Sequence, residues 1–311
     1  MRSMKRWGGV ASGIAAASLA ASVAFGANEA DKRVEGKGGA SGVESHELPH
    51  PSRQSWSFAG VFGKYDTAQL QRGFKVYREV CSSCHSANLV SFRNLAEPGG
   101  PMFSDAQVKA LAAEYKIKDG PNDSGEMFER PGRPSDHWPA PFPNDQAARA
   151  ANGGGLPPDM SVLAKARDLH NSFPFFLFNA VPGLAYQEGG VDYITALLQG
   201  YSDPPADVKL DAGQYWNKIM PGNKIAMPPP LTGDGQVTYD DGTPSTVAQN
   251  AKDVAAYMMW MAEPKLDARK RTGFRALIFL SVLSALLWLT KRRVWSKVKL
   301  SHGVHQRAPA E

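Results

Sequence analysis

Apolar residues recur at helical spacing in several places along the chain. The first run has apolar side chains at i, i+4, i+7 and i+11, namely Leu70, Phe74, Tyr77 and Cys81. This spacing puts them on one face of a helix. Asp66 or Thr67 stands before the run, and both types of side chain cap helix N-termini. The pattern predicts a helix that begins near Asp66 and leads to Cys81.

Two further helices are predicted by a capping pattern followed by an apolar stripe. Ser104 and Gln107 form one capping pattern, and Thr246 and Gln249 form the other. The stripes are Val108, Leu111, Ala112 and Tyr115 in the first case, and Val247, Ala251, Val254, Ala255, Met258 and Met261 in the second. Methionine at helical spacing is typical of core packing, so we expect the methionines of 258–261 in the core.

Residues 118–158 show no helical period and are dense in Gly, Pro, Asp and Asn. Phe128, Trp138 and Phe142 are spread through this stretch and favour burial. The stretch therefore predicts a long ordered loop that covers something, since long loops in compact domains are usually functional.

Two shorter helices are predicted beyond this loop. One covers residues 160–168, with Asp159 as its N-cap. The other covers residues 191–199 and is ended by Gly200. Together with the longer helices, they predict a mainly α fold with long loops.

The C-terminal part contains a different kind of helix. Residues 276–290 carry no charge, and as a helix they would be ~22 Å long at about 1.5 Å per residue. Including residues 273–275 lengthens the run, and Trp288 and Trp295 are placed as interface anchors. A buried core helix is the alternative, but basic triplets on both sides of the run argue against it. The pattern predicts one transmembrane anchor.

The N-terminus is typical of a secretory signal. Three basic residues, Arg2, Lys5 and Arg6, precede an uncharged Ala-rich run that ends near residue 27. A permanent anchor is the alternative, but the run is only moderately hydrophobic. The predicted organisation is a signal peptide at 1–27, an exported domain at 28–264, the anchor with its flank at 265–290 and a cytoplasmic tail at 291–311.

Charge is divided unevenly between these segments. The whole chain has a net charge of +5. Residues 1–27 carry three basic groups, and residues 265–311 carry eleven basic and two acidic groups, which leaves 21 basic and 28 acidic groups in residues 28–264. The exported domain therefore has a net charge of −7. This gives no support for nucleic-acid binding. An acidic surface can steer a basic partner, although it also serves solubility.

The chemistry of the chain centres on Cys81-Ser82-Ser83-Cys84-His85, which contains both of its cysteines. Cys-x-x-Cys-His is the attachment pattern of c-type haem: the thiols form thioethers with the two vinyl groups, and the histidine binds the iron. A zinc site would need more ligands, and a redox dithiol usually accompanies a βαβ pattern. We find no convincing acid–base pair, nucleophile or phosphate loop.

The second iron ligand must come from elsewhere in the chain. The candidates outside the signal are Met102, Met127, Met160, Met220 and Met227, with His137 and His170. Met227 precedes three prolines, which hold it extended on a stiff support. Local reasoning favours Met227 and leaves the two histidines as alternatives.

Four stretches resemble the cytochrome c1 family, the haem subunits of ubiquinol–cytochrome c oxidoreductase. They are WSFAGVFGKYDTAQLQRGFKVYREVCSSCHS at 56–86, AARAANGGGLPPDMS at 147–161, KIAMPPPL at 224–231 and YDDGTPSTVAQNAKDVAAYMMWMAEPKLDARKRTGF at 239–274. The C-terminal anchor with its basic flanks matches as well. The Cys-x-x-Cys-His motif is shared by all c-type cytochromes, whereas the other stretches are specific to this family.

The resemblance implies a class I cytochrome c-like haem domain with one transmembrane helix. It also implies one covalent haem c. The implied binding residues are Cys81 and Cys84 as thioether sites, His85 as proximal ligand, Met227 as distal ligand, and Arg167 and Tyr193 near the propionates. Residues 169–189 look like an insertion relative to shorter family members.

The implied function is that of a redox subunit, which is not an enzyme on its own. It would pass one electron from a Rieske iron–sulfur protein to cytochrome c, in a complex that also contains cytochrome b. The implied location is a bacterial inner membrane, with a single span and the haem domain on the periplasmic side.

Two other functions are compatible with a haem motif and a tail anchor. One is a stand-alone membrane-anchored monohaem cytochrome that serves a terminal oxidase. The other is a haem peroxidase, which would normally show a second haem motif.

Overall fold

The computed structural model describes residues 51–168 and 187–305. These residues contain seven α-helices, two 3₁₀ turns and two two-stranded sheets, so the fold is mainly α as predicted. The predicted signal peptide, His170 and most of the 169–189 insertion lie outside the described residues.

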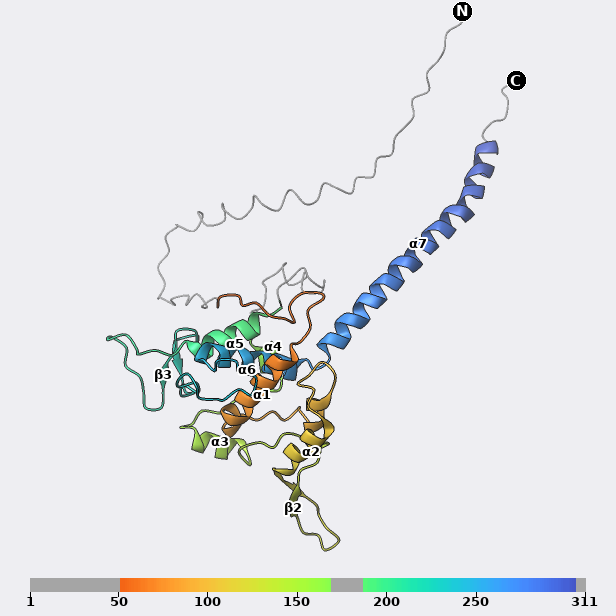
Figure 1. Cartoon of the computed structure of the whole chain (residues 1–311). Helices are drawn as coiled ribbons and strands as arrows, with labels where there is room; N and C mark the ends of the chain where they lie inside the picture. Colours follow the sequence, from red (N-terminus) through yellow and green to blue (C-terminus); the bar gives the residue numbers. More distant parts are fainter. Residues whose placement is uncertain (1–50, 169–186, 306–311) are drawn as a thin grey trace, which may run out of the picture. The chain divides into compact units, whose positions relative to one another are not determined.

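The centre of the fold is the pair formed by α1 (Thr67–Glu79) and α6 (Val247–Ala262), which pack against each other (Figure 1). Both predicted caps are confirmed: the Asp66 carboxylate accepts from Ala68 N at 3.0 Å, and the Thr246 hydroxyl accepts from Gln249 N at 3.1 Å. The helices approach very closely at Gly73, where a Cβ atom would lie 2.1 Å from a backbone oxygen of α6. A side chain at this position would push the two helices apart.

Two more helices pack around this pair. α5 (Gly189–Gln199) lies against α6 and ends at Gly200 as predicted. α2 (Asp105–Ala113) begins with the predicted capping box of Ser104 and Gln107, and contacts the 3₁₀ turn η3 (Phe92–Ala96). The methionines of 258–261 are at most 5% exposed, so the prediction that they belong to the core is confirmed.

The prediction of a loop over residues 118–158 is partly wrong. The structure has an antiparallel hairpin of β1 (Lys116–Asp119) and β2 (Phe128–Pro131), and a helix α3 (Asp145–Ala151). Trp138 is 3% exposed as expected, but Phe128 is 43% exposed. Phe128 pairs with Asp119 at the end of a two-stranded hairpin, which offers no second layer to bury it.

The helix predicted over residues 160–168 is also shorter than expected. Only α4 (Leu163–Ala166) forms, and Asp159 does not cap it. The Asp159 carboxylate instead accepts hydrogen bonds from Ser86 Oγ, Asn88 N and Ser161 N, each at 2.8 Å. The carboxylate thus joins the 159–161 turn to a segment distant in sequence, and α4 begins after Val162 instead. A small sheet of β3 (Tyr215–Trp216) and β4 (Lys224–Ile225) completes the domain.

The C-terminal helix α7 (Leu266–His305) has 40 residues. Its segment Leu266–Ser296 is long and apolar enough to cross a membrane, and none of its most apolar window is buried in the protein. The prediction of one apolar C-terminal helix is thus confirmed by length and composition. Ion pairs hold the chain around the start of α7, from Lys265 to Glu97 and from Arg269 to Glu263.

The hairpin is expected to be sensitive to acid through Arg130, which pairs with Asp119 and with Asp136 (2.6 Å). The Arg130 hydrogen bonds are the largest cause that lowers the pKa of Asp136, to about 2. A carboxyl group whose folded-state pKa is depressed stabilises the fold above its unfolded pKa of about 4, and loses this effect as the pH falls toward the folded value.

We therefore expect Arg130→Gln to raise the pKa of Asp136. The hairpin of the variant should begin to open between roughly pH 4 and 3, a range in which the Arg130–Asp136 pair of the unchanged protein still holds. Titration of the Asp136 carboxyl carbon by NMR, with amide exchange in β1 and β2, measures both effects. Identical titration of Asp136 in the two proteins would show that the pair does not control it.

Candidate haem site

The Cys-x-x-Cys-His motif folds as one tight turn directly after α1. The 3₁₀ turn η2 (Cys81–Ser83) follows the helix, and the backbone N–H groups of Cys84 and His85 both donate to the carbonyl of Cys81, at 3.1 and 2.9 Å. The two cysteines form no disulfide; Cys81 is buried and Cys84 half-buried. The turn therefore gathers the two thiols and the imidazole at the end of a helix that is locked into the core.

The His85 ring is held in one orientation by a backbone carbonyl. Its Nδ1 lies 2.8 Å from the carbonyl oxygen of Pro158, to which it donates. Among the described residues no group hydrogen-bonds Nε2, which remains free for a ligand. Burial lowers the pKa of His85, which favours the neutral imidazole that binds metals. An imidazole oriented through its other nitrogen is the usual arrangement of a metal ligand.

The Cys81 thiol is kept neutral by its surroundings. Burial raises its pKa to about 12. Zinc sites and reactive dithiols need thiolates, whose pKa is lowered by nearby positive charge. A buried neutral sulfur fits a permanent thioether better than either alternative. Two cysteines that form no disulfide and an Nε2 atom without a partner among the described residues thus fit covalent haem.

A second segment clamps this turn from the other side. Asp159 binds Ser86 and Asn88 as described above, and the backbone N–H of Met160 donates to the carbonyl of Ser86 at 2.8 Å. Burial alone would raise the pKa of Asp159, but these hydrogen bonds outweigh it and keep the pKa below its usual value. The ionised carboxylate fixes the 157–161 segment, and with it the carbonyl of Pro158 that orients His85.

Met227 lies in a segment that runs close to the loop before Pro158. Its backbone carbonyl accepts from the Tyr201 hydroxyl at 3.1 Å, and the carbonyl of Pro230 accepts from Gln236 Nε2 at 2.9 Å, so the proline stretch is held at both ends. A Cβ atom on Gly155 would lie 3.3 Å from the Ala226 side chain. The loop that holds His85 through Pro158 therefore passes close to the residue before Met227.

The other methionine candidates have different surroundings. Met102 and Met127 are 54% and 64% exposed, and Met160 is buried in the core. The sulfur of Met220 accepts a hydrogen bond from the Tyr193 hydroxyl at 3.6 Å. No described side chain donates to the sulfur of Met227.

The two residues expected near the propionates lie on neighbouring elements. Arg167 ends α4 and is exposed, while Tyr193 lies on α5 and is buried. Burial raises the pKa of Tyr193, and the positive charge of Arg167 partly offsets this. His137 is exposed, in an isolated bridge with Ser91.

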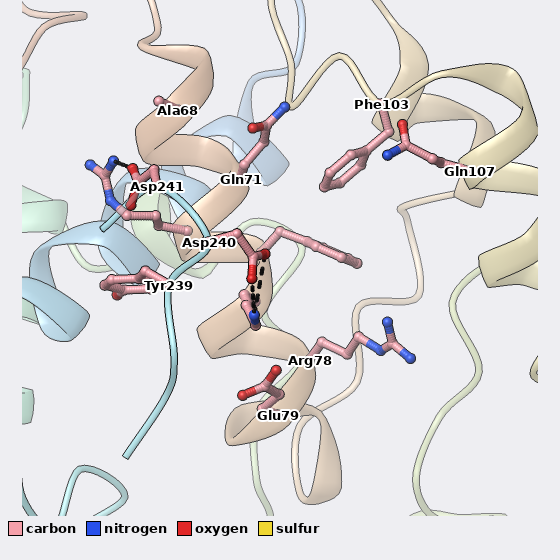
Figure 2. A pocket seen from close by; sticks show the side chains of 12 residues that line it. Ala68, Gln71, Arg78, Glu79, Phe103, Gln107, Tyr239, Asp240 and Asp241 are labelled. Carbon is pink, nitrogen blue, oxygen red and sulfur yellow. Dashed lines mark hydrogen bonds and ion pairs between the residues drawn. The ribbon is translucent and has the colours of Figure 1, made fainter. Parts of the chain in front are cut away.

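A pocket of about 570 Å³ lies along α1, but none of the predicted site residues lines it. Figure 2 shows charged side chains of both signs around it, including Arg78, Glu79 and Asp240. The Asp240 carboxylate accepts from Lys75 Nζ across the pocket at 3.1 Å. This charged wall does not suit a flat apolar macrocycle.

A model of the Cytochrome C1 family matches residues 56–298. The chain belongs to the cytochrome c1 family. Cytochrome c1 of Rhodospirillum rubrum is 46% identical over 79% of this chain and 88% of its own length. The cytochrome c1-2, heme protein, mitochondrial, of Solanum tuberosum is 44% identical over 82% of this chain and 88% of its own length.

A third relative is longer than this chain. The "Cytochrome b/c1" of Bradyrhizobium diazoefficiens is 57% identical over 79% of this chain, but the match spans only 36% of that protein. Cytochrome c1 is a haem protein of electron transport, so the cofactor of this chain is one covalent haem c.

Sequence reasoning missed the residues that hold the site together. The 147–161 stretch signalled the family, but nothing in its spacing linked Pro158 or Asp159 to His85, which lies 73 positions before Pro158. No sequence pattern pointed to Tyr201, because its hydrogen bond to the carbonyl of Met227 depends on where the chain runs after the β3–β4 hairpin.

Proposed function

We propose that the chain is the electron-transfer subunit of a ubiquinol–cytochrome c oxidoreductase. It passes one electron from a Rieske iron–sulfur protein to a cytochrome c and is not an enzyme on its own. The observation that carries this proposal is the Cys81–His85 turn with His85 oriented by Pro158, in a cytochrome c1 chain whose last helix can span a membrane.

Three residues of the turn, the two cysteines and the histidine, have roles in holding the cofactor. Cys81 and Cys84 would form the thioether bonds, and His85 would bind the iron through Nε2 while Nδ1 stays on the carbonyl of Pro158. The bound haem supplies the one-electron chemistry. The protein holds it at a fixed place and keeps the imidazole neutral.

Met227 is the second iron ligand in this proposal. Its support is the proline stretch held at both ends, the close approach of Gly155 to Ala226, and the absence of a hydrogen-bond donor to its sulfur among the described residues. A thioether ligand raises the reduction potential. Arg167 and Tyr193 are proposed to face the propionates, with a cation and a hydroxyl as donors.

The same proposal sets the topology of the chain. Residues 1–27 are a cleaved signal, 28–264 the exported haem domain, 265–290 the anchor with its flank, and 291–311 a cytoplasmic tail. The chain then crosses a bacterial inner membrane once, with the haem domain in the periplasm. The apolar helix and the bacterial relatives support a membrane anchor.

Two partners follow from the site and from the relatives. The name of the Bradyrhizobium relative joins cytochromes b and c1 in one protein, which supports cytochrome b as a neighbour of this chain. The net charge of −7 on residues 28–264 favours a basic cytochrome c as acceptor, with an encounter rate that falls as salt is added.

Purification of the complex tests this proposal. A C-terminally tagged chain extracted in mild detergent is expected to carry a cytochrome b and a Rieske protein in equal amounts, and to reduce cytochrome c with ubiquinol. A tagged, unrelated single-span protein from the same membrane is the control. A haem-loaded chain that purifies alone would instead indicate a stand-alone cytochrome that serves a terminal oxidase.

A further inference from the structure

The segment 56–65, before α1, places one aromatic residue in an unusual position. It contains four aromatic side chains, of which Trp56, Phe58 and Tyr65 are buried at 5%, 1% and 8% exposure. Phe62 is 74% exposed. Its exposure exceeds that of Phe279, which at 66% is the most exposed large apolar residue in the part of α7 whose side chains are described.

This exposure does not come from a loose loop. Trp56 Nε1 donates to the Asp192 carboxylate at 2.8 Å, which fixes the beginning of the segment to α5. The chain then folds back so tightly that a Cβ atom on Gly63 would lie 2.1 Å from the carbonyl oxygen of Ala59. The fold therefore holds the Phe62 side chain outside the core.

The same loop is bound to the start of α7. Lys270 Nζ donates to the carbonyls of Phe58 and Gly60, at 2.5 and 2.6 Å. The Phe62 ring packs edge-on against Phe274, with 5.3 Å between ring centroids and 75° between ring planes. Phe62 therefore lies at the level of Phe274 along the helix.

This level is the edge of the predicted membrane span. Phe274 stands two residues before the uncharged run 276–290, which is about 3 Å along a helix axis. The run itself covers only ~22 Å, whereas the hydrocarbon core is about 30 Å thick. The hydrocarbon must therefore reach past the ends of the run, toward Phe274 and its neighbour Phe62.

We propose that Phe62 inserts into the lipid interface beside α7, giving the exported domain a second contact with the membrane. Apolar aromatic side chains bury well at the headgroup–acyl boundary. Arg271 and Arg275 lie on the adjoining turns of α7, at a level where cations can bind lipid phosphates. A single helix leaves the domain free to turn about its axis; two lipid contacts joined through Lys270 restrict that rotation.

The inference rests on the proposal that α7 spans the membrane, and spin labels can test the two separately. Both native cysteines are occupied by haem in the loaded chain, so one introduced cysteine gives a unique label. Phe62→Cys is compared with Leu283→Cys, in the middle of the apolar run, and with Met127→Cys, which is 64% exposed on the hairpin segment. The full chain is studied in phosphatidylcholine vesicles, with the haem reduced.

Power saturation then compares the access of oxygen, which enters lipid, with that of a water-soluble nickel complex. The oxygen-to-nickel ratio at Phe62 is expected to be several-fold above that at Met127 and below that at Leu283. A ratio at Phe62 equal to that at Met127, with Leu283 lipid-buried, overturns the inference alone. A Leu283 label open to nickel overturns the transmembrane proposal.

A second label keeps Phe62 in place, in case Phe62→Cys fails to take up haem. Lys64→Cys lies two residues away on the exposed side of the loop. Its oxygen-to-nickel ratio is expected to drop severalfold when Phe62→Ser is added, with an unchanged haem spectrum as the folding control. An unchanged ratio, or poor access to both reagents as under a protein surface, would overturn the lipid contact.

Discussion

Replacing Met227 with leucine is expected to lower the reduction potential of the haem by more than roughly 0.1 V, within the ~0.8 V range over which axial ligands set it. The thioether favours ferrous iron and raises the potential, whereas leucine offers no ligand atom. The weak red absorption band of methionine-ligated ferric haem should disappear as well. Potentiometric titration and the ferric spectrum measure the two effects.

The matched control for this experiment is Met220→Leu. Met220 is also a half-buried methionine, but its sulfur already accepts from Tyr193, so we expect the band to remain and the potential to change little. A band that survives Met227→Leu and disappears in Met220→Leu would overturn the assignment. Unchanged far-UV circular dichroism in both variants shows that the fold is retained.

The helices that frame the site were predictable because their signals are local. α1 and α6 each combine a capping side chain with an uninterrupted apolar stripe, and both begin where the caps indicated. The Cys81–His85 turn was predictable for the same reason, since its chemistry lies within five consecutive residues. Such signals depend little on the rest of the fold.

The predictions that failed concern residues whose partners lie nine or more positions away in the sequence. β1 and β2 consist of KIKD and FERP, without the apolar alternation that signals a strand, and they form because Lys116 to Asp119 pair with residues nine to fifteen positions away. Asp159 looked like a helix cap, yet it binds residues about 70 positions earlier. Turn-rich sequences do not reveal which distant group they will contact.

The same distinction applies within the candidate site. The sequence predicts which atoms can bind iron, because Cys, His and Met side chains are the donors. It does not predict how they are oriented. The backbone carbonyl of Pro158 accepts a hydrogen bond from His85 Nδ1, and the Tyr201 hydroxyl donates to the backbone carbonyl of Met227. Orientation therefore has to be read from the structure.

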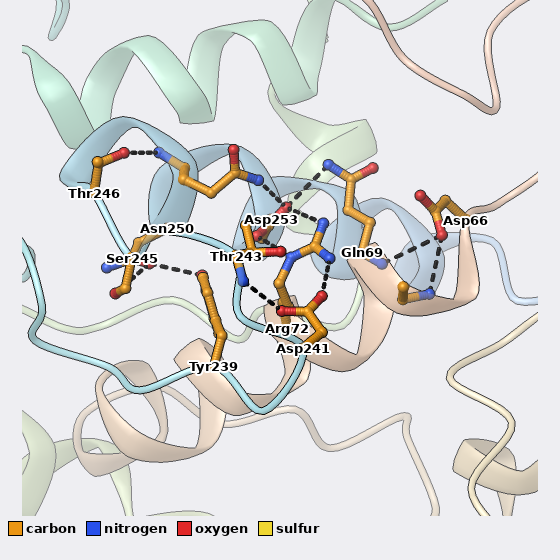
Figure 3. A network of polar contacts seen from close by, with 12 residues as sticks. Asp66, Gln69, Arg72, Tyr239, Asp241, Thr243, Ser245, Thr246, Asn250 and Asp253 are labelled. Carbon is orange, nitrogen blue, oxygen red and sulfur yellow. Dashed lines mark hydrogen bonds and ion pairs between the residues drawn. The ribbon is translucent and has the colours of Figure 1, made fainter.

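The α1–α6 pair that carries the site depends on the buried carboxylate of Asp253. It is 0% exposed and accepts from Arg72 Nε at 2.8 Å, Gln69 Nε2 at 3.1 Å and Gln249 Nε2 at 2.8 Å (Figure 3). Arg72 also binds Asp241 at 2.6 Å. Burial would lower the pKa of Arg72, but these two carboxylates outweigh it and raise the pKa above its usual value.

Asp253→Ala is therefore expected to destabilise the haem-loaded chain by about 3 kcal/mol, at the lower end for a broken buried pair because Arg72 keeps Asp241. For a domain of this size the midpoint of thermal unfolding should fall by roughly 6–12 °C. The loss arises because the mutation leaves a cation and two amide groups poorly partnered between α1 and α6. Denaturant unfolding, followed by circular dichroism and Soret absorbance, measures it.

Asp240→Ala is the matched control. Asp240 stands next to Asp241, its side chain is 90% exposed, and within the described residues it pairs with Lys75 alone. Exposed ion pairs contribute little, so we expect a change within about 0.5 kcal/mol. If Asp253→Ala costs no more than this control, the carboxylate does not hold α1 to α6. If Asp253→Ala lowers the stability by the expected amount, the Arg72–Asp253 pair supports the end of α1 and the turn that carries Cys81 and His85. Neither residue of this pair belongs to the haem-binding motif.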